Sequence, residues 1–323
     1  MGRSPILPKG FADIPSQAGN HARLCCPPGE RGIPSPNVDA DEEQELIDAA
    51  RDGSRPALER LLEHHQARVY RFGMKMCRHP EDAQDVLQET MLAMAGSIGD
   101  FRGASSLSSW VFAIARSFCV KMRRKSKFAP KRLDSLEQGA GGEARTLADP
   151  TRTPDELASG RELEAKLQRA IEALEPAQRE VLILRDIEGL KASEVADALG
   201  VSVAAVKSRL HRARVHVRDR VAPTLDPPEP TQTSATACPD VLNLYSKYLE
   251  GEISPGVCAQ MQRHLDRCAR CSDTCDSLKR TLSLCSQLPD APLPASVQTS
   301  VREALAEYLD AQLPRPVAPS KKS

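Results

Sequence analysis

The chain has 323 residues, and its 44 Lys and Arg balance 44 Asp and Glu, so the formal net charge is zero. This length favours two or three small domains over a single core. No apolar run has the length of a membrane span or a secretory leader, which predicts a cytoplasmic protein without a membrane partner. Frequent Ala, Leu, Arg and Glu, with almost no alternating β-branched segments, predict an all-α fold.

The neutral total charge conceals two basic stretches. No Asp or Glu occurs between Asp100 and Asp134, although this interval contains several Arg and Lys. The second stretch runs from Lys207 to Arg220 and is interrupted only by Asp219. Clusters of this kind indicate binding to a polyanion such as nucleic acid.

Composition and helical periodicity divide the chain into seven segments. Pro- and Gly-rich stretches without periodicity indicate disorder or linkers, and periodic apolar residues indicate helical domains. In chain order we expect a disordered extension (1–42), a helical domain (43–128), a flexible linker (129–160), a second helical domain (161–221), a Pro-rich linker (222–237), a Cys-rich domain (238–287) and a tail (288–323) with one amphipathic helix (296–312).

The most specific local pattern is ASEVADALGVSVAAVKSRLHRAR, residues 192–214. It predicts a helix-turn-helix, because Gly200 can adopt the positive φ of a sharp turn and Ser202 is a suitable N-cap. On the second helix Val203, Val206 and Leu210 are expected to face inward. The polar residues left to face outward are Lys207, Ser208, Arg209, His211, Arg212 and Arg214. A basic second helix suits the DNA major groove, although a solvated basic helix is the simpler alternative.

The residues around this motif resemble an extracytoplasmic-function (ECF) sigma factor of bacterial RNA polymerase. The segment 174–214, beginning LEPAQREVLILRDIEGL, is similar to the domain that reads the −35 promoter element. EDAQDVLQETMLAM, followed by DFRGASSLSSWVFAIARSFCVKMRRKSK, is similar to the −10 domain. Two departures are that Ala204 and Ala205 replace the usual Gly-Thr, and that Ser117 replaces the usual Asn. The resemblance implies a transcription initiation factor that is not an enzyme.

The resemblance also implies binding residues for promoter DNA and for core RNA polymerase. It implies −35 contacts at Ser202, Ala204, Ala205, Lys207, Ser208, Arg209, His211 and Arg212. It implies −10 contacts at Arg102, Ser105, Arg116, Lys121, Arg123 and Arg124. The β′ clamp helices of polymerase would meet Asp82, Asp85, Gln88 and Glu89, and the β flap would be a further partner. No catalytic constellation is recognisable, and His64 and His65 are expected on a helix surface.

The Cys-rich domain contains HLDRCARC, residues 264–271. On one helix, His264 and Cys268 would share a face and Cys271 would lie one further turn along. Zinc takes four thiolate or imidazole ligands in a tetrahedron, and Cys238 is the best candidate for the fourth. This pattern resembles zinc-binding anti-sigma domains, in which a further helix follows, here 296–312. The resemblance implies an intramolecular contact that holds the sigma domains shut.

Three cysteines remain outside this ligand set: Cys258, Cys275 and Cys285. They are candidate sensing thiols, and soft thiolates would also accept another thiophilic metal such as Cu(I) or Cd(II). Alternatively, zinc only stabilises a small helical module. A different class of protein also stays open, namely a helix-turn-helix regulator that binds DNA without joining polymerase and uses its zinc domain to dock a partner.

Overall fold

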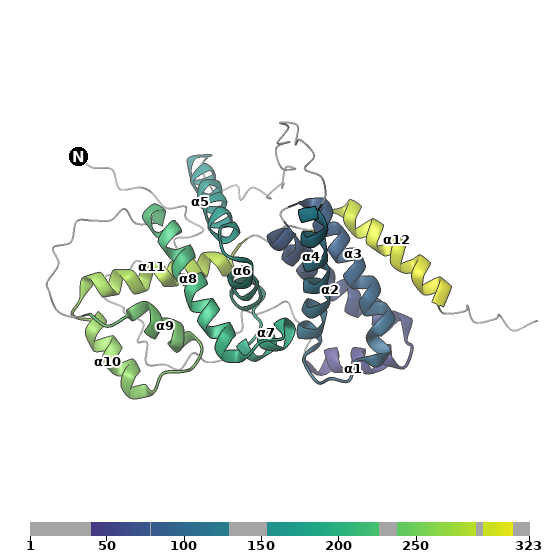
Figure 1. Ribbon diagram of the computed structural model, residues 1–323, viewed down its shortest axis with the longest axis horizontal. Helices are drawn as coiled ribbons and strands as arrows, with labels where there is room; N and C mark the ends of the chain where they lie inside the picture. The colour runs from purple at the N-terminus through teal and green to yellow at the C-terminus, as the bar shows by residue number, and fades with distance from the viewer. Residues whose placement is uncertain (1–39, 78, 129–153, 226–237, 289–292, 313–323) are drawn as a thin grey trace, which may run out of the picture. The chain divides into compact units, whose positions relative to one another are not determined.

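A computed structural model describes residues 40–77, 79–128, 154–225, 238–288 and 293–312, and every regular element among them is helical. This confirms the all-α fold (Figure 1). Contacts between helices divide the described residues into two units, each described here by itself. The α1–α4 unit contains residues 40–128, 193–202 and 293–312, and the α8 unit contains residues 154–192, 203–225 and 238–288.

The α1–α4 unit is a bundle whose core lies between α2, α3 and α4. Its elements are α1 (Ala40–Arg51), α2 (Arg55–Cys77), α3 (Pro80–Ser97), the short helix η1 (Ile98–Asp100), α4 (Leu107–Phe128), α7 (Ala192–Leu199, from its second residue) and α12 (Ala295–Gln312). Phe72 on α2 and Phe112 on α4 are fully buried, and their rings meet edge to face with centroids 5.5 Å apart. Such aromatic pairs add to the apolar burial that stabilises a helical core.

Helix α3 begins and packs as its sequence requires. Pro80 occupies the first turn, where its missing N–H costs nothing, and Glu81 and Asp82 lie at the positive end of the helix dipole. Gly73 on α2 lets α3 approach closely, since a Cβ there would lie 3.1 Å from the Cα of Ala83. The acidic surface of α3 is therefore fixed on the core by a tight contact with α2.

The α8 unit is organised around one long helix. Its elements are α5 (Pro154–Glu172), α6 (Pro176–Leu182), the π-helical turn η2 (Ile183–Ile187), α8 (Val203–Leu225), α9 (Val241–Leu249), α10 (Pro255–Leu265) and α11 (Ala269–Ser286). Val206 and Leu210 are buried, as predicted, and α8 packs against both α5 and α6. Val203 was expected to face inward too, but it is 38% exposed at the first residue of the helix. Helix α5 also begins at Pro154, inside the predicted linker 129–160.

The turn before α8 has the predicted form. Helix α7 (Ala192–Leu199) ends where Gly200 adopts a φ of +65°, a left-handed conformation that favours glycine. The backbone N–H of Val201 then donates to the carbonyl of Ala196. These local features produce the helix, turn and helix that the sequence indicated.

The Cys-rich segment folds as three short helices that share a small core. Asp240 caps α9 by accepting a hydrogen bond from the Asn243 N–H, and Ser254 caps α10 through the Val257 N–H. Tyr245, Met261 and Leu278, one from each helix, meet in the core. Helices α9 and α11 also pack against α8, and α11 crosses α8 (Figure 1). The Cys-rich domain is thus attached to the helix-turn-helix.

Candidate metal centre and nucleic-acid interface

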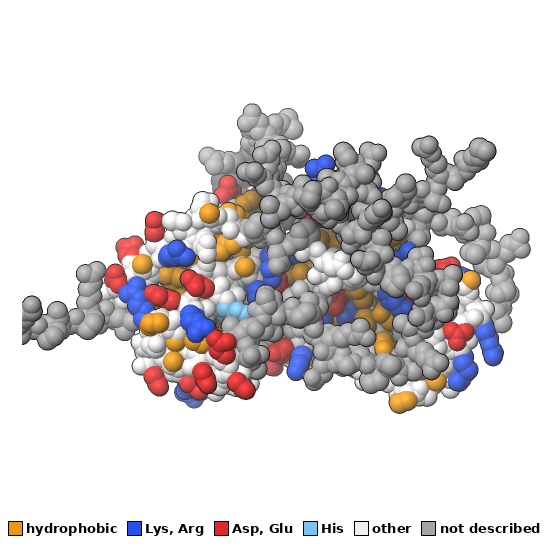
Figure 2. Space-filling view, turned by 180° about the vertical axis from the view of Figure 1, so that it is seen from behind, with side chains coloured by type: hydrophobic (Ala, Val, Ile, Leu, Met, Phe, Trp, Pro, Cys, Tyr) orange, Lys and Arg blue, Asp and Glu red, His pale blue; other side chains and the backbone are white. Residues whose placement is uncertain are grey.

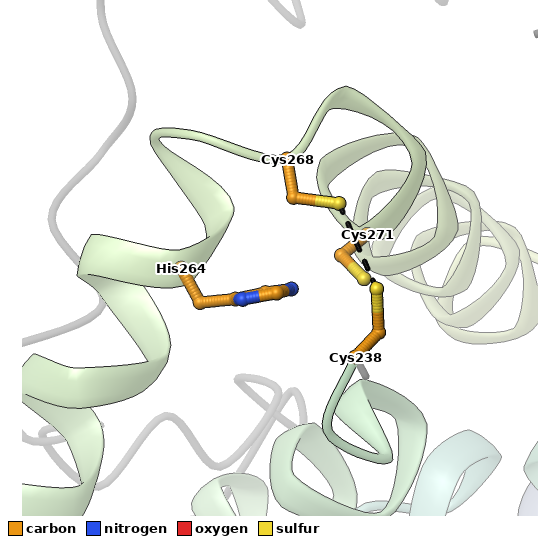
Figure 3. A group of neighbouring side chains, drawn as sticks. All are labelled: Cys238, His264, Cys268 and Cys271. Carbon is orange, nitrogen blue, oxygen red and sulfur yellow. Dashed lines mark hydrogen bonds between the residues drawn. The ribbon is translucent and has the colours of Figure 1, made fainter. Parts of the chain in front are cut away.

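Four side chains from three parts of the Cys-rich domain converge on one point. They are Cys238, which precedes α9, His264 on α10, and Cys268 and Cys271 at the start of α11 (Figure 3). One ligand atom from each lies within 4.8 Å of the others, and the Cys238 and Cys268 sulfurs are 4.0 Å apart. With Zn–S bonds of about 2.3 Å, a tetrahedral zinc ion separates its sulfurs by about 3.8 Å. The observed spacing is close to this value.

The motif HLDRCARC does not form the single helix that its spacing suggested. Helix α10 ends at Leu265, and α11 begins at Ala269 after Cys268, which has an extended backbone with φ −123° and ψ 96°. The N–H groups of Arg267 and Cys268 both donate to the carbonyl of His264, which closes a tight turn. The break matters because it lets His264 and Cys268 approach Cys238 from two directions.

The chemistry of the four donors fits zinc. The Nε2 atom of His264 is buried and makes no hydrogen bond, an expensive arrangement for a polar atom unless it binds a ligand. Hydrogen bonds from the N-terminal turn of α11, chiefly the Cys271 N–H, lower the pKa of Cys268 and favour the thiolate that metals bind. Burial, followed by hydrogen bonds and charge repulsion from the neighbouring thiols Cys238 and Cys268, raises the pKa of Cys271 to about 12, and a bound dication would offset this cost of forming the thiolate. When bound, zinc would join these three parts of the domain.

The three surplus cysteines are all buried. Cys258 and Cys275 belong to the core of the Cys-rich domain, and Cys285 is fully buried farther along α11. Burial raises the pKa of Cys275 to about 11, which disfavours its reactive thiolate form. These environments support a packing role, and the predicted sensing role stays a prediction.

The recognition helix α8 presents two polar stripes. In the first stripe Ser208 and Arg212, four residues apart, are exposed, and the Arg212 Nε donates to the Ser208 carbonyl. Ser202 and Ala204 are also exposed, whereas Ala205 and Arg209 are half-buried. Four of the eight predicted −35 contacts, namely Ser202, Ala204, Ser208 and Arg212, are therefore exposed.

The second stripe of α8 is covered by the Cys-rich domain. Lys207 donates to Glu252 across 2.7 Å, and the His211 Nδ1 lies 3.2 Å from the Ser246 hydroxyl. About two turns further on, Arg218 donates to the Ser277 hydroxyl of α11 across 2.8 Å. Burial also lowers the pKa of His211, which favours the uncharged ring. Two of the predicted −35 contacts, Lys207 and His211, are thus in contact with the Cys-rich domain.

Arg214 lies in the same stripe and corrects the sequence-based expectation that it faces outward. Its guanidinium, 2% exposed, donates to both carboxylate oxygens of Asp186 at 2.6 and 2.8 Å, and to Glu250 at 2.9 Å. Glu250 also accepts from Arg185 across 3.2 Å. A buried cation is tolerated because it is paired in this bidentate way. Sequence inspection missed Glu250, Glu252 and Ser246, since helical spacing indicates which residues share a face but not what covers it.

The predicted −10 contacts lie on α4 and on the loop that precedes it. Arg102 and Lys121 are exposed, and the Lys121 ammonium lies 4.8 Å from the centre of the Phe118 ring. Ser105, Arg116 and Arg123 are half-buried. The side chain of Arg124 and the extension before residue 40 are outside the described residues, as are Cys25 and Cys26.

The predicted polymerase contacts lie on α3, where Asp85 and Glu89 are exposed and Asp82 and Gln88 half-buried. On the face of the α1–α4 unit that Figure 2 shows, acidic and basic side chains are interspersed. The expectation for His65 was wrong, because it is fully buried and neither ring nitrogen makes a hydrogen bond. None of the described helices is long and apolar enough to cross a membrane.

Comparisons with known families agree with this geometry. Residues 61–128 match the family "Sigma-70 region 2", residues 164–217 match "Sigma-70, region 4", and residues 238–272 match "Putative zinc-finger". These matches define the class of protein: a sigma factor of the sigma-70 type with a zinc-finger domain behind its helix-turn-helix.

Individual relatives narrow the class. The chain is 31% identical over 173 residues to the ECF RNA polymerase sigma factor SigM of Mycobacterium tuberculosis, covering 54% of this chain and 81% of the relative. It is 30% identical to SigE of Mycolicibacterium smegmatis (55% and 66%) and 29% identical to SigG of M. tuberculosis (62% and 59%). The chain thus spans less than two thirds of the latter two. It belongs to the ECF RNA polymerase sigma factor family, which confirms the resemblance and its non-enzymatic character.

Proposed function

We propose that this protein directs core RNA polymerase to specific promoters, and that its C-terminal zinc domain restrains it within the same chain. The first part rests on family membership together with the exposed residues on three elements. These are the polar stripe of α8 at Ser208 and Arg212, the basic positions on α4, and the acidic residues Asp85 and Glu89 on α3. Promoter DNA and the β′ clamp helices and β flap of polymerase are the corresponding partners.

The single observation that carries the restraint is the contact of Glu252, Ser246 and Ser277 with the second stripe of α8. A helix with its side chains is about 10–12 Å across, and the major groove is about 12 Å wide. The groove therefore has no room for a second protein layer on the flank of α8. DNA that enclosed this flank, with its cations Lys207 and Arg218, would have to displace the Cys-rich domain.

A second contact supports the same proposal in the α1–α4 unit, where α12 packs against α3. Its buried residues recur every fourth position, at Val297, Val301, Leu305 and Leu309. Arg55 at the start of α2 also pairs with Asp310 across 2.7 Å. The segment that follows the zinc domain in the chain therefore packs on the helix that carries the predicted polymerase contacts.

The proposal is tested by transcription from a target promoter with core polymerase and the full-length protein. We expect a variant that combines Glu252→Ala with Val301→Asp to initiate more often than the wild type, because both restraining contacts are weakened. Glu303→Ala, at an exposed position of α12, is the matched control. Equal activity of all three proteins would contradict the restraint. Binding to DNA without binding to core polymerase would instead favour a helix-turn-helix regulator of another class.

Zinc is the proposed cofactor, held by Cys238, His264, Cys268 and Cys271. Loss of the metal, or oxidation of its cysteine ligands, would loosen the fold of the Cys-rich domain. Its contact with the second stripe of α8 would weaken as a result. Metal analysis of protein purified without oxygen, before and after a chelator, measures the occupancy. Transcription measured on the same samples shows whether release of the metal relieves the restraint.

A further inference from the structure

Two cysteines that belong to neither the zinc cluster nor the promoter contacts lie side by side in the α1–α4 unit. Cys77 is the last residue of α2, and Cys119 lies past the middle of α4. Their sulfurs are 3.3 Å apart and share a hydrogen bond, although 42 positions separate the residues in the chain. They are not joined by a disulfide.

The arrangement is close to that of a disulfide. A sulfur–sulfur bond is about 2.05 Å long, so the two atoms need to approach by about 1.3 Å to form one. Cys119 has no exposure, whereas Cys77 keeps 7% at the end of its helix. A small oxidant would therefore reach Cys77 first, and Cys119 would follow as the resolving thiol.

The surroundings of Cys77 also favour its reactive form. The hydrogen bond between the two thiols is the largest cause that lowers the pKa of Cys77, and the Arg123 guanidinium acts in the same direction. Burial and the Asp82 carboxylate oppose this, but the pKa stays below its ordinary value. A larger thiolate fraction at neutral pH increases reactivity towards peroxides.

We propose that Cys77 and Cys119 form a second oxidation-sensitive site, at which a hydroperoxide converts the two thiols into a disulfide between α2 and α4. The Cys77 thiolate attacks the peroxide and becomes a sulfenic acid, and one molecule of alcohol, or of water from hydrogen peroxide, is released. The Cys119 thiolate then attacks the Cys77 sulfur and expels the hydroxyl group as water. Two thiols are oxidised by two electrons, and one peroxide is reduced.

The bond would fasten the end of α2 to the helix that carries Arg116 and Lys121. The disulfide closes a loop that contains all of α3. It would therefore raise the midpoint of thermal unfolding of the α1–α4 unit, by about 10 °C at most. This site is separate from the zinc ligands, so an oxidant could act on the α1–α4 unit without displacing zinc. The inference does not depend on the proposed restraint.

The test uses the full-length, zinc-loaded protein, treated with a small excess of hydrogen peroxide, alkylated and digested with trypsin. The two cysteines fall in short peptides, MCR (76–78) and SFCVK (117–121), that contain no other cysteine. We expect a linked peptide that is lighter than the sum of the two by two hydrogens and that disappears after reduction. The zinc content, measured in parallel, should not change while this link forms.

Two variants are compared with the wild type. Cys119→Ala should abolish the link, whereas Cys285→Ala, a buried cysteine on α11, should leave it intact. If Cys119→Ala fails to fold, Cys77→Ala replaces it, and the wild-type digest alone still decides. The proposal would be overturned if Cys77 and Cys119 could still be alkylated at a peroxide dose that had already oxidised the zinc-site cysteines. The predicted stabilisation would be contradicted if the oxidised protein contained the link but its midpoint of thermal unfolding were no higher than that of the reduced protein.

Discussion

Lys207 of the recognition helix donates a hydrogen bond to Glu252 of the zinc domain across 2.7 Å. A cation that the sequence suggests for DNA binding is thus paired with a carboxylate of the same chain. Both partners are partly exposed, at 23% and 39%, so the pair contributes little to folding stability, about 0–1 kcal/mol. Its importance is that Glu252 and a DNA phosphate would compete for one ammonium group.

Glu252→Gln should therefore increase DNA binding without destabilising the protein. We expect the affinity for a −35 duplex to rise a few-fold and the salt dependence of binding to steepen by about one phosphate contact, since Lys207 becomes available. Fluorescence anisotropy at several salt concentrations measures both. Lys207→Gln should remove the gain in the double variant, and a gain that persisted there would contradict the competition.

Glu250→Gln tests the buried part of the same interface. Arg214 keeps its pair with Asp186 but loses a charged partner in a site where it is 2% exposed. We expect the free energy of unfolding, measured with urea, to fall by about 1–3 kcal/mol. Glu252→Gln provides the comparison, because its effect should stay below about 1 kcal/mol. Equal effects of the two substitutions would refute the special role of Glu250.

His264→Ala should remove the metal from the Cys-rich domain. With only three donors, zinc affinity should fall by orders of magnitude, and α9–α11 should lose most of the stability that the metal supplies. Elemental analysis gives the metal content, and circular dichroism with and without a chelator gives the helix content. Cys258→Ala removes a thiol from the same core that is outside the ligand cluster, so it should retain the metal. Loss of metal from both variants would argue for a larger or different site.

His65 predicts a pH dependence of stability. Burial, assisted by the charge of Arg68 and by His64, holds the pKa of His65 well below its ordinary value of 6.5, and Glu43 is 3.9 Å away. Below about pH 6.5, His65 binds a proton in the unfolded chain but stays unprotonated in the folded protein. The free energy of unfolding should therefore decrease as the pH falls from about 6.5, by up to about 1.4 kcal/mol per pH unit.

Urea unfolding between neutral and mildly acidic pH measures this slope. His65→Leu should reduce it, because the titrating group is replaced by an apolar side chain suited to a buried position. His79→Gln, at an exposed position, should leave the slope as in the wild type. An unchanged slope in His65→Leu would show that other groups cause the pH dependence.

Gly73→Ala tests the close approach of α2 and α3. The added Cβ would lie 3.1 Å from the backbone Cα of Ala83, a contact that only a shift of one helix can relieve. We expect a loss of about 1–3 kcal/mol in the free energy of unfolding. The control is Gly99→Ala, where a Cβ meets nothing within 4 Å and φ is not positive. If both variants lose the same stability, packing against Ala83 is not the cause.

Local sequence features predicted much of this structure because they depend on short-range geometry. Gly200 marks the turn of the helix-turn-helix, Pro80 begins α3, and the apolar residues Val206 and Leu210 identify the inner face of α8. The candidate ligand set Cys238, His264, Cys268 and Cys271 was also predictable, since metal sites require certain residue types at short spacings. The break between α10 and α11 was not, because helical spacing alone does not show where a helix ends.

The sequence by itself determined the family, the all-α fold and the residues that can bind metal, all of which follow from local pattern and residue type. Only the tertiary structure decided which polar residues are covered. Arg214 was indistinguishable in sequence from its basic neighbours on α8, yet it is buried against Asp186 and Glu250. The pairing of Cys77 with Cys119 likewise joins residues 42 positions apart. Such contacts depend on how helices pack, and helix packing is a property of the whole fold.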